Sequence, residues 1–255
     1  MPVPPLPSAQ EFRDRVAVVT GGTNGLGRHL CQTLIELGAE VFFCGRREQA
    51  GRQLAERWGA RAHFVQCDLA DVRAASSFVR EAGEFRGHID YLVNNAAIDP
   101  VIPFQKATVA DFDRVIAINL RSYFVVASAA LNYLQAGAGK AIVNICTTSY
   151  MFGWPGATVY NAAKSGIVGF SRSLARDLGP LGIRVNVVSP GWIMTERQLA
   201  EKVTPRDRQE LLDTQCVKEL LTEEHVTPVT LFLLSAAARG ICGQNIVVDG
   251  GKFMY

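Results

Sequence analysis

Tyr160 and Lys164 stand four residues apart in the segment YNAAK, inside a stretch whose pattern predicts a helix over 158–178. This spacing puts both side chains on one helical face. A tyrosine ionises near about pH 10, and a neighbouring lysine ammonium stabilises the phenolate and lowers that pKa. Such a pair is suited to take a proton from an alcohol or give one to a carbonyl. The same spacing also occurs in helices for structural reasons, so its meaning depends on the residues that accompany it.

A glycine-rich segment, TGGTNGLG at 20–27, follows the first apolar run and opens a helical pattern. Gly21 permits a sharp turn, Gly25 lets backbone N–H groups approach a pyrophosphate, and Gly27 lets the helix pack closely. The free N–H groups and the positive dipole end of that helix favour an anion. The spacing is GxxxGxG rather than GxGxxG, and alone it also fits a simple turn. Its place between a strand and a helix favours a phosphate site of a dinucleotide.

The end of the second apolar run should meet the adenosine ribose of such a cofactor. The sequence there is CGRR at 44–47, so the acidic position is Gly45 and Arg46 follows it. An arginine fork pairs with a phosphate dianion, which favours NADP over NAD, with NAD as the alternative. Arg46 and Arg47 also fit the solvated start of a helix. Asp68 can accept from the adenine amino group, cap the next helix, or do both.

These groups must be positioned by strands and helices that alternate along the chain. Nearly continuous apolar runs predict buried parallel strands at 15–20, 40–44, 62–67, 89–95, 141–146, 184–189 and 245–249. Helices are expected near 25–37, 48–58, 71–84, 108–134, 158–178, 195–212 and 222–235. The alternation predicts an α/β fold, a single doubly wound parallel sheet of about seven strands with helices on both faces. We expect one domain over 12–255 and a proline-rich, flexible tail over 1–11.

Composition excludes several classes of protein. The chain has 255 residues, 48% of them hydrophobic, and Lys plus Arg exceed Asp plus Glu by only 26 to 24. This balance argues against a nucleic-acid binder, whose basic residues would be in excess on one face. The longest uncharged stretch, between Arg121 and Lys140, contains polar residues and predicts a buried helix rather than a membrane span. Six scattered cysteines predict reduced thiols in a cytoplasmic protein, and four separated histidines give no metal-ligand spacing.

Together these features resemble the short-chain dehydrogenase/reductase family in its form of about 250 residues. TGGTNGLG at 20–27 is similar to the family's TGxxxGxG turn, NNAA at 94–97 to its NNAG element, and YNAAK at 160–164 to its YxxxK. Pro190 and Gly191, followed by Thr195, are similar to its PG…T segment. The resemblance covers about 12–252, in family order. Ala97 departs from the glycine of NNAG.

The resemblance implies a Rossmann-type fold, a nicotinamide cofactor and a set of catalytic residues. It implies Tyr160 as the acid/base, with Lys164 as its pKa-lowering partner and a ligand of the nicotinamide ribose. Asn119 falls where the family binds a proton-relay water through a backbone kink. The substrate-orienting serine of the family, thirteen residues before the tyrosine, becomes Thr147, which keeps the hydroxyl but restricts χ1. The expected cofactor-binding residues are Gly21, Thr23, Asn24, Gly25, Leu26, Gly27, Arg46, Asp68, Leu69, Asn95, Ala96, Tyr160, Lys164, Pro190, Gly191, Ile193 and Thr195.

The segment 191–221 is expected to cover the active site as a substrate lid. Polar groups and aromatic walls near the catalytic hydroxyls suit a small hydroxyl-rich substrate, although each residue alone also fits an ordinary surface position. The expected substrate contacts are Ser149, Trp154, Trp192, Asp99 and Gln198, with Tyr150, Glu196 and Arg197 nearby. The stretch WIMTERQ at 192–198 also resembles, less specifically, the sugar (aldose) 1-dehydrogenases of the family.

The sequence therefore predicts an oxidoreductase that passes a hydride between NADP, or NAD, and a sugar or polyol. The alternative within the same fold is a 3-oxoacyl thioester reductase, which would want a basic patch for its acidic carrier. A non-catalytic nucleotide-binding regulator is disfavoured because Tyr160, Lys164 and Asn119 are all present. The resemblance also implies a homotetramer, with the helices expected near 108–134 and 158–178 as interface candidates.

Overall fold

The computed structural model describes residues 9–254. Of the flexible tail expected over 1–11, residues 1–8 lie outside the described residues. Ala9–Phe12 form a short helix, α1. The side chain of Phe12 is fully buried and its ring lies 5.4 Å from that of Tyr91. The segment just before the first strand is therefore packed on the core.

Seven parallel strands form one sheet in the order β3-β2-β1-β4-β5-β6-β7. Each strand matches an apolar run of the sequence, so the predicted fold class is confirmed. The order reverses between β1 and β4, which is where a doubly wound sheet opens a crevice for a ligand at its carboxyl edge. The strands are β1 (Val16–Val19), β2 (Glu40–Gly45), β3 (Ala62–Gln66), β4 (Tyr91–Asn94), β5 (Ala141–Ile145), β6 (Arg184–Pro190) and β7 (Asn245–Val248).

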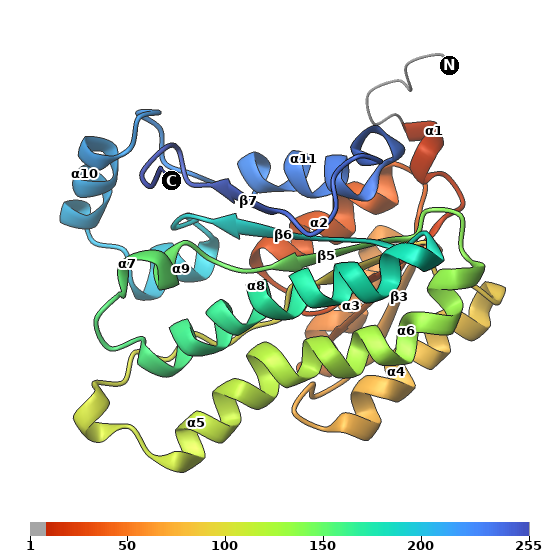
Figure 1. The fold of residues 1–255 in the computed structure, drawn as a ribbon, viewed down its shortest axis with the longest axis horizontal. Coiled ribbons are helices and arrows are strands. Elements are labelled where there is room, and N and C mark those ends of the chain that lie inside the picture. The colour runs from red at the N-terminus through yellow and green to blue at the C-terminus, as the bar shows by residue number, and fades with distance from the viewer. Residues whose placement is uncertain (1–8, 255) are drawn as a thin grey trace.

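Helices cover both faces of this sheet (Figure 1). One core layer lies between the sheet and α2 (Gly25–Glu36), α3 (Glu48–Trp58) and α11 (Glu223–Leu234). The opposite layer lies under α4 (Val72–Arg86), α6 (Ser122–Ala136) and α8 (Thr158–Leu178). The central strands are almost wholly buried, because apolar side chains project from both faces of each strand and helices cover both faces of the sheet.

Two of the expected helices are interrupted. The helix expected over 108–134 consists of α5 (Val109–Ile116) and α6, joined by a π-helical turn at Ala117–Arg121. In this turn the Ser122 backbone N–H donates to the carbonyl of Ala117, five residues back. A single π turn inserts one residue and rotates everything that follows by about 100°. The apolar periodicity of the sequence does not show this turn, because the apolar pattern continues through it on more than one face of the helix.

The helix expected over 195–212 is also two helices, α9 (Glu196–Glu201) and α10 (Pro205–Thr214). Pro205 has no backbone N–H and therefore cannot continue a preceding helix, but it suits the first turn of a new one. The Thr204 side chain accepts from the Asp207 N–H and caps that turn. A short helix that the sequence did not indicate, α7 (Ser149–Phe152), lies beside the start of α8.

One helical stretch, Val109–Ala136, is long and apolar enough to cross a membrane by composition alone, with a mean hydropathy of 1.4 over its most apolar window. Half of that window is buried inside the fold. Val126, Ala130 and Leu134 of this stretch lie in the core under the sheet, which is how a core helix behaves.

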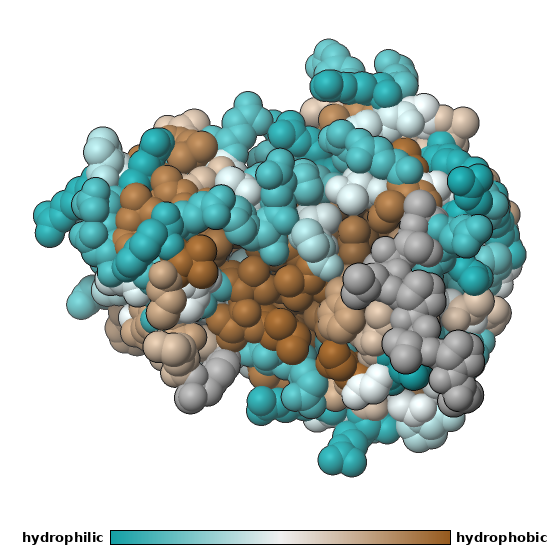
Figure 2. Space-filling model, turned by 90° about the horizontal axis from the view of Figure 1, so that it is seen from above, coloured by the Kyte–Doolittle hydropathy of each residue, from teal (hydrophilic) through white to brown (hydrophobic). Residues whose placement is uncertain are grey.

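Figure 2 shows the face above β7 and α11, where apolar side chains gather at the centre. β7 is the last strand of the sheet. Its residues Ile246 and Val248 are only partly buried, as is Val229 of α11.

Candidate active site

The glycine-rich turn lies between the end of β1 and the start of α2, and its geometry explains its glycines. Gly21 has a φ of +69° and Gly25 one of +49°, both in the left-handed region that favours glycine. A methyl group added at Gly27 would overlap the carbonyl oxygen of Gly21 and the side-chain amide of Asn95. The turn therefore folds directly back on α2, and Asn24 caps this helix by accepting from the Gly25 N–H at 2.9 Å. This cradle fits the pyrophosphate of a dinucleotide, held at a helix N-terminus.

Thr20 joins this turn to the end of β4, a role that the sequence analysis missed. Its buried hydroxyl accepts from the backbone N–H groups of Asn95 and Ala96, at 2.9 and 3.1 Å. The Asn95 side chain donates back to the carbonyl of Thr20 at 3.0 Å. Ala96 packs against Gly21, where an added methyl would lie 2.9 Å from its Cα. Ala97 is exposed, so its departure from the family's glycine disturbs no packing.

The segment after β6 closes the same crevice from the other side. Pro190 ends β6, and Gly191 lies against Asp249, where an added methyl would approach its Cβ to 2.9 Å. Thr195 caps α9 by accepting from the Gln198 N–H. Its methyl lies 3.3 Å from the Cβ position of Gly25. The PG…T segment and the glycine turn, far apart in sequence, therefore lie together.

At the adenosine end, the structure brings the side chain of Thr23 against Gly45. A methyl added at Gly45 would lie 2.7 Å from the Thr23 hydroxyl, so an acidic side chain has no room at this position. Arg46 is exposed and follows directly. Asp68 accepts from the Ala70 N–H at 3.0 Å. The suggestion that Asp68 caps the next helix is wrong, because Asp71 is the residue that caps α4.

The Thr147 side chain lies beside the Tyr160 hydroxyl, close enough to influence its pKa. Thr147 follows β5 and Tyr160 lies in the first turn of α8, so two elements present their hydroxyls to one place. Burial raises the pKa of Tyr160 above its ordinary value, and the carboxylate of Asp99 adds to this rise, while the Thr147 hydroxyl opposes it. The sequence argument expected a lowered pKa. In this structure the loss of hydration outweighs the lowering effects of the Thr147 hydroxyl and the Arg197 charge.

Lys164 lies one helical turn beyond Tyr160 and is almost completely buried. Its Nζ donates to the carbonyl of Ile145 at 2.9 Å and lies 5.9 Å from the centre of the Tyr160 ring. Burial lowers the pKa of Lys164 to about 8, against weaker raising effects of Cys146 and Asp99. The lysine and the tyrosine thus share one face of α8, as their spacing predicts.

Asn119 lies inside the π-helical turn and is fully buried. Its side-chain oxygen accepts from the Ile98 N–H and its side-chain nitrogen donates to the Ile98 carbonyl, both at 2.8 Å. The side chain of Asn119 is thus fixed on the backbone of Ile98, which leaves the backbone of Asn119 as the group that would hold a water. The kink that the resemblance implied is present at this residue.

Four of the five expected substrate residues form one connected wall. The rings of Trp154 and Trp192 meet edge to face at 5.7 Å. The Trp192 indole N–H donates to Gln198 at 3.0 Å, and Gln198 donates to Asp99 at 3.1 Å. Asp99 also accepts from Arg197 at 2.8 Å. The polar groups of this wall are paired with one another, which the sequence could not indicate.

Ser149, the fifth expected substrate residue, is not part of this wall. Its hydroxyl donates to the side chain of Asn161 at 2.8 Å, and its backbone N–H donates to the Thr147 hydroxyl at 3.1 Å. Ser149 therefore supports the loop that carries Thr147, and its hydroxyl is already bonded within the protein.

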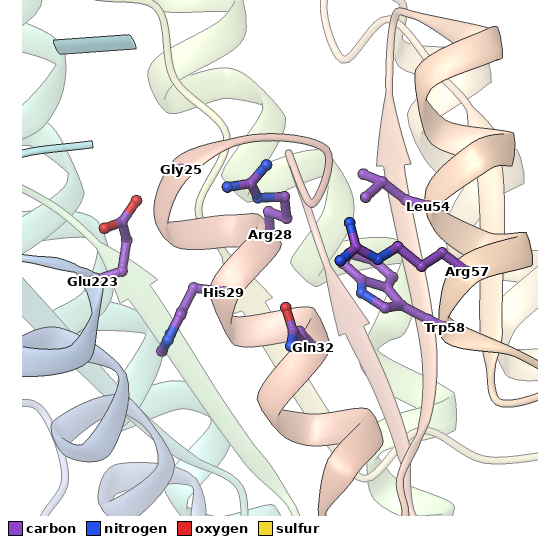
Figure 3. Close-up of a pocket in the computed structure, with 8 residues that line it drawn as sticks. All are labelled: Gly25, Arg28, His29, Gln32, Leu54, Arg57, Trp58 and Glu223. Atoms are coloured by element: carbon purple, nitrogen blue, oxygen red, sulfur yellow. The ribbon is translucent and has the colours of Figure 1, made fainter. Parts of the chain in front are cut away.

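A separate pocket of about 250 Å³ opens on the outer side of α2 (Figure 3). Gly25 connects it to the glycine turn, but none of the catalytic candidates borders it. Its lining residues are Gly25, Arg28, His29, Gln32, Leu54, Arg57, Trp58 and Glu223. Within residues 9–254, no group of three or more His, Cys, Asp or Glu side chains is arranged to hold a metal ion.

Comparison with known proteins agrees with this architecture. Residues 21–252 match the family model described as enoyl-(acyl carrier protein) reductase. With its parallel sheet, glycine turn and Tyr160–Lys164 pair, the chain belongs to the short-chain dehydrogenase/reductase family and is an oxidoreductase of alcohol and carbonyl groups that uses a nicotinamide cofactor.

Individual relatives differ in substrate. The chain is 35% identical to a protein named probable galactose dehydrogenase, from Rhizobium meliloti, over 97% of this chain and 99% of that protein. It is 33% identical to the 3-oxoacyl-[acyl-carrier-protein] reductase of Chlamydia muridarum, over 93% of this chain and 97% of the other. A solved dehydrogenase/reductase of Sinorhizobium meliloti is 29% identical, with a TM-score of 0.86 and coverage of 96% and 98%.

Proposed function

We propose that this protein oxidises an aldose at C1 to a lactone, with NADP as the hydride acceptor. The observation that carries the proposal is the placement of the Thr147 and Tyr160 hydroxyls beside the wall built from Asp99, Trp154 and Trp192. The bound nicotinamide supplies the acceptor for the hydride that leaves the alcohol carbon. The protein's own residues must hold the alcohol, take its proton and exclude competing water.

The reacting oxygen is held by the Thr147 and Tyr160 hydroxyls, and Tyr160 takes its proton. Because burial raises the pKa of Tyr160, the neutral phenol is favoured without additional positive charge. Lys164 supplies such charge from the same helical face and donates to the nicotinamide ribose. The backbone of Asn119 holds the water that links the site to solvent.

The cofactor proposal rests on the ribose end of the crevice. Thr23 occupies the space that an acidic side chain at position 45 would need, which supports a phosphate rather than a free 2′-hydroxyl. Arg46 would then pair with this phosphate as a charge-assisted contact. The pyrophosphate is assigned to the turn at Gly21, Gly25 and Gly27, and the nicotinamide to the segment after Pro190. Asn95, Ala96, Asp68 and Leu69 complete the adenosine side.

The substrate proposal rests on the wall. The Asp99 carboxylate accepts hydrogen bonds from three donors. A carboxylate has about four acceptor positions, so one remains for a sugar hydroxyl. Trp154 is 38% exposed, which leaves ring surface for the apolar face of a sugar. Similarity to a galactose dehydrogenase supports the same substrate class.

The same proposal includes a cytoplasmic homotetramer without nucleic-acid or membrane partners. All six cysteines are free thiols, which suits a reducing compartment. Two surfaces support assembly. One is the apolar face over β7 and α11 (Figure 2), and the other is the side of α5 and α6, where Phe112 and Phe124 are exposed.

The decisive experiment is a screen for cofactor reduction with aldoses, polyols and cyclohexanol, and for cofactor oxidation with 3-oxoacyl thioesters, using both NADP and NAD. A site built on hydrogen bonds rejects analogues that leave its polar groups unpaired, so sugars should greatly exceed simple alcohols. Single deoxy-sugars should then identify which hydroxyls are bound. Efficient turnover of 3-oxoacyl thioesters without activity on any aldose or polyol would replace this substrate class by the alternative one and leave the catalytic residues unchanged.

A further inference from the structure

One backbone carbonyl next to the catalytic pair accepts two hydrogen bonds. The carbonyl of Ile145 receives Nζ of Lys164 and the hydroxyl of Tyr123, each at 2.9 Å. The β4–β5 ladder ends at the pair Asn94–Asn144, one residue before Ile145. This carbonyl therefore lies where the pairing of β5 with β4 stops and side chains replace backbone N–H groups as donors.

The ring of Tyr123 also faces the ammonium group. Nζ of Lys164 lies 5.6 Å from the centre of this ring and 5.9 Å from that of Tyr160. Both distances are within the range in which the π face of an aromatic ring attracts a cation. The Tyr123 side chain is fully buried, so little water screens this attraction.

The place of Tyr123 follows from the π-helical turn. Tyr123 is the second residue of α6, directly after the turn at Ala117–Arg121. The inserted residue rotates the start of α6, and Tyr123 packs with Cys146, Ile167 and Val187 beneath the active site. The turn thus contributes Asn119 and aims Tyr123 at the same catalytic lysine.

We propose that Tyr123 is a positioning residue for Lys164: the face of its ring attracts the ammonium, and its hydroxyl competes with the ammonium for the Ile145 carbonyl. This inference rests on the proposed role of Lys164 as a cofactor ligand and pKa-setting group. It adds a residue of α6 to a site otherwise built from α8 and the ends of the strands.

The two contacts act on Lys164 in opposite directions. The Tyr123 hydroxyl competes for the Ile145 carbonyl, which weakens the hydrogen bond between this carbonyl and the Lys164 ammonium. The ring stabilises the ammonium directly. Lys164 is also faced by the Cys146 thiol, the Asp99 carboxylate and the Tyr160 phenol. Burial raises the pKa of Tyr123 well above its ordinary value, so its hydroxyl remains a donor while Lys164, with a pKa of about 8, titrates.

The test compares Tyr123→Phe with Tyr123→Leu, using the fluorescence of bound NADPH and NADH between pH 6 and 10. Binding should weaken as Lys164 loses its proton. Tyr123→Phe removes the competing donor and keeps the ring, so the alkaline midpoint should rise by roughly half a pH unit. Tyr123→Leu also removes the ring, so its midpoint should fall below that of Tyr123→Phe. Tyr133→Phe, a hydroxyl deletion farther along α6, is the matched control and should keep the wild-type midpoint.

Lys164→Met separates the possible failures. If this variant keeps the wild-type alkaline midpoint, the role of Lys164 itself is wrong. If Lys164→Met abolishes the midpoint while both Tyr123 variants keep it unchanged, only the role of Tyr123 is overturned. A merely structural Tyr123 would lower the melting temperature of both variants without moving the two midpoints apart.

Discussion

Asp99 binds Lys202 across 103 residues of sequence, with Nζ of Lys202 2.7 Å from one carboxylate oxygen and 3.0 Å from the backbone carbonyl of Asp99. Arg197 holds the other carboxylate oxygen at 2.8 Å. Arg197 belongs to α9 and Lys202 directly follows it, whereas Asp99 follows β4. The contact therefore fastens the segment expected to be the lid to the rim of the active site.

Asp99→Asn should loosen this attachment. Burial raises the pKa of Asp99, but hydrogen bonds and charge from Lys202 and Arg197 outweigh it and leave the pKa below its ordinary value. A carboxyl group with a lowered pKa contributes stability above its unfolded pKa of about 3.8 and loses it as the pH falls through its folded pKa. The variant should exchange the amide hydrogens of residues 196–203 faster at pH 7. The wild-type protein should match the exchange rate of the variant only in acid, where Asp99 becomes protonated.

The reference for this measurement is Glu196→Gln. Glu196 lies 3.7 Å from Arg28, and its side chain is 79% exposed, so this ion pair contributes little. Equal exchange of α9 in both variants and wild type would show that Asp99 does not secure the lid.

Tyr160→Phe should bind NADPH like wild type and lose turnover by about 10²–10⁴-fold, the usual contribution of general acid/base catalysis. The ring and its packing remain, and only the hydroxyl that meets Thr147 is removed. Steady-state kinetics with separate cofactor titration gives both numbers. Near wild-type turnover would exclude Tyr160 as the acid/base.

Thr147 and Ser149 can be distinguished in the same assay. Thr147→Ser keeps the hydroxyl and should remain active, whereas Thr147→Ala should lose rate because the reacting oxygen loses one partner. Ser149→Ala should be milder, since the Ser149 hydroxyl bonds to Asn161. If Ser149→Ala were the more damaging change, the hydroxyl that orients the substrate would be Ser149.

Much of this arrangement could be predicted from the sequence, because it depends on local spacing. The seven apolar runs specify seven strands, and glycines at 21, 25 and 27 specify a tight turn onto a helix. Apolar periodicity continues across the interruptions at Ala117–Arg121 and before Pro205, so it showed neither, and only the family resemblance implied the kink at Asn119.

Long-range pairing was the part that local patterns could not show. Asp99 and Gln198 were both recognised as polar groups near the site, but their hydrogen bond joins residues 99 positions apart. Thr20 was overlooked for the same reason, since its partners Asn95 and Ala96 are determined by the order of β1 and β4. The direction of the pKa shift of Tyr160 depends on burial, which only the assembled fold reveals.

Arg46→Ala should weaken NADP much more than NAD. Loss of a charge-assisted contact costs about 1.5–3 kcal/mol, or roughly a 10- to 150-fold loss of affinity for the phosphorylated cofactor. Arg47→Ala, a neighbouring arginine that caps α3 without a side-chain bond, is the matched control. Dissociation constants for NADPH and NADH decide the matter. A wild-type preference for NADH would reject the assignment of Arg46 to the 2′-phosphate.

Gly27→Ala should abolish binding of both cofactors. The added methyl would overlap the carbonyl of Gly21 and the amide of Asn95, so the turn must move away from α2 and lose its cradle. Gly169→Ala is the matched control, because Gly169 lies inside α8 with nothing within 4 Å of its Cβ position. An alanine in an exposed helix interior should stabilise the fold by about 0.5–1 kcal/mol without changing cofactor affinity. Thermal melts and NADPH titrations of both variants test this, and full NADPH affinity in a folded Gly27→Ala protein would contradict the phosphate assignment of the turn.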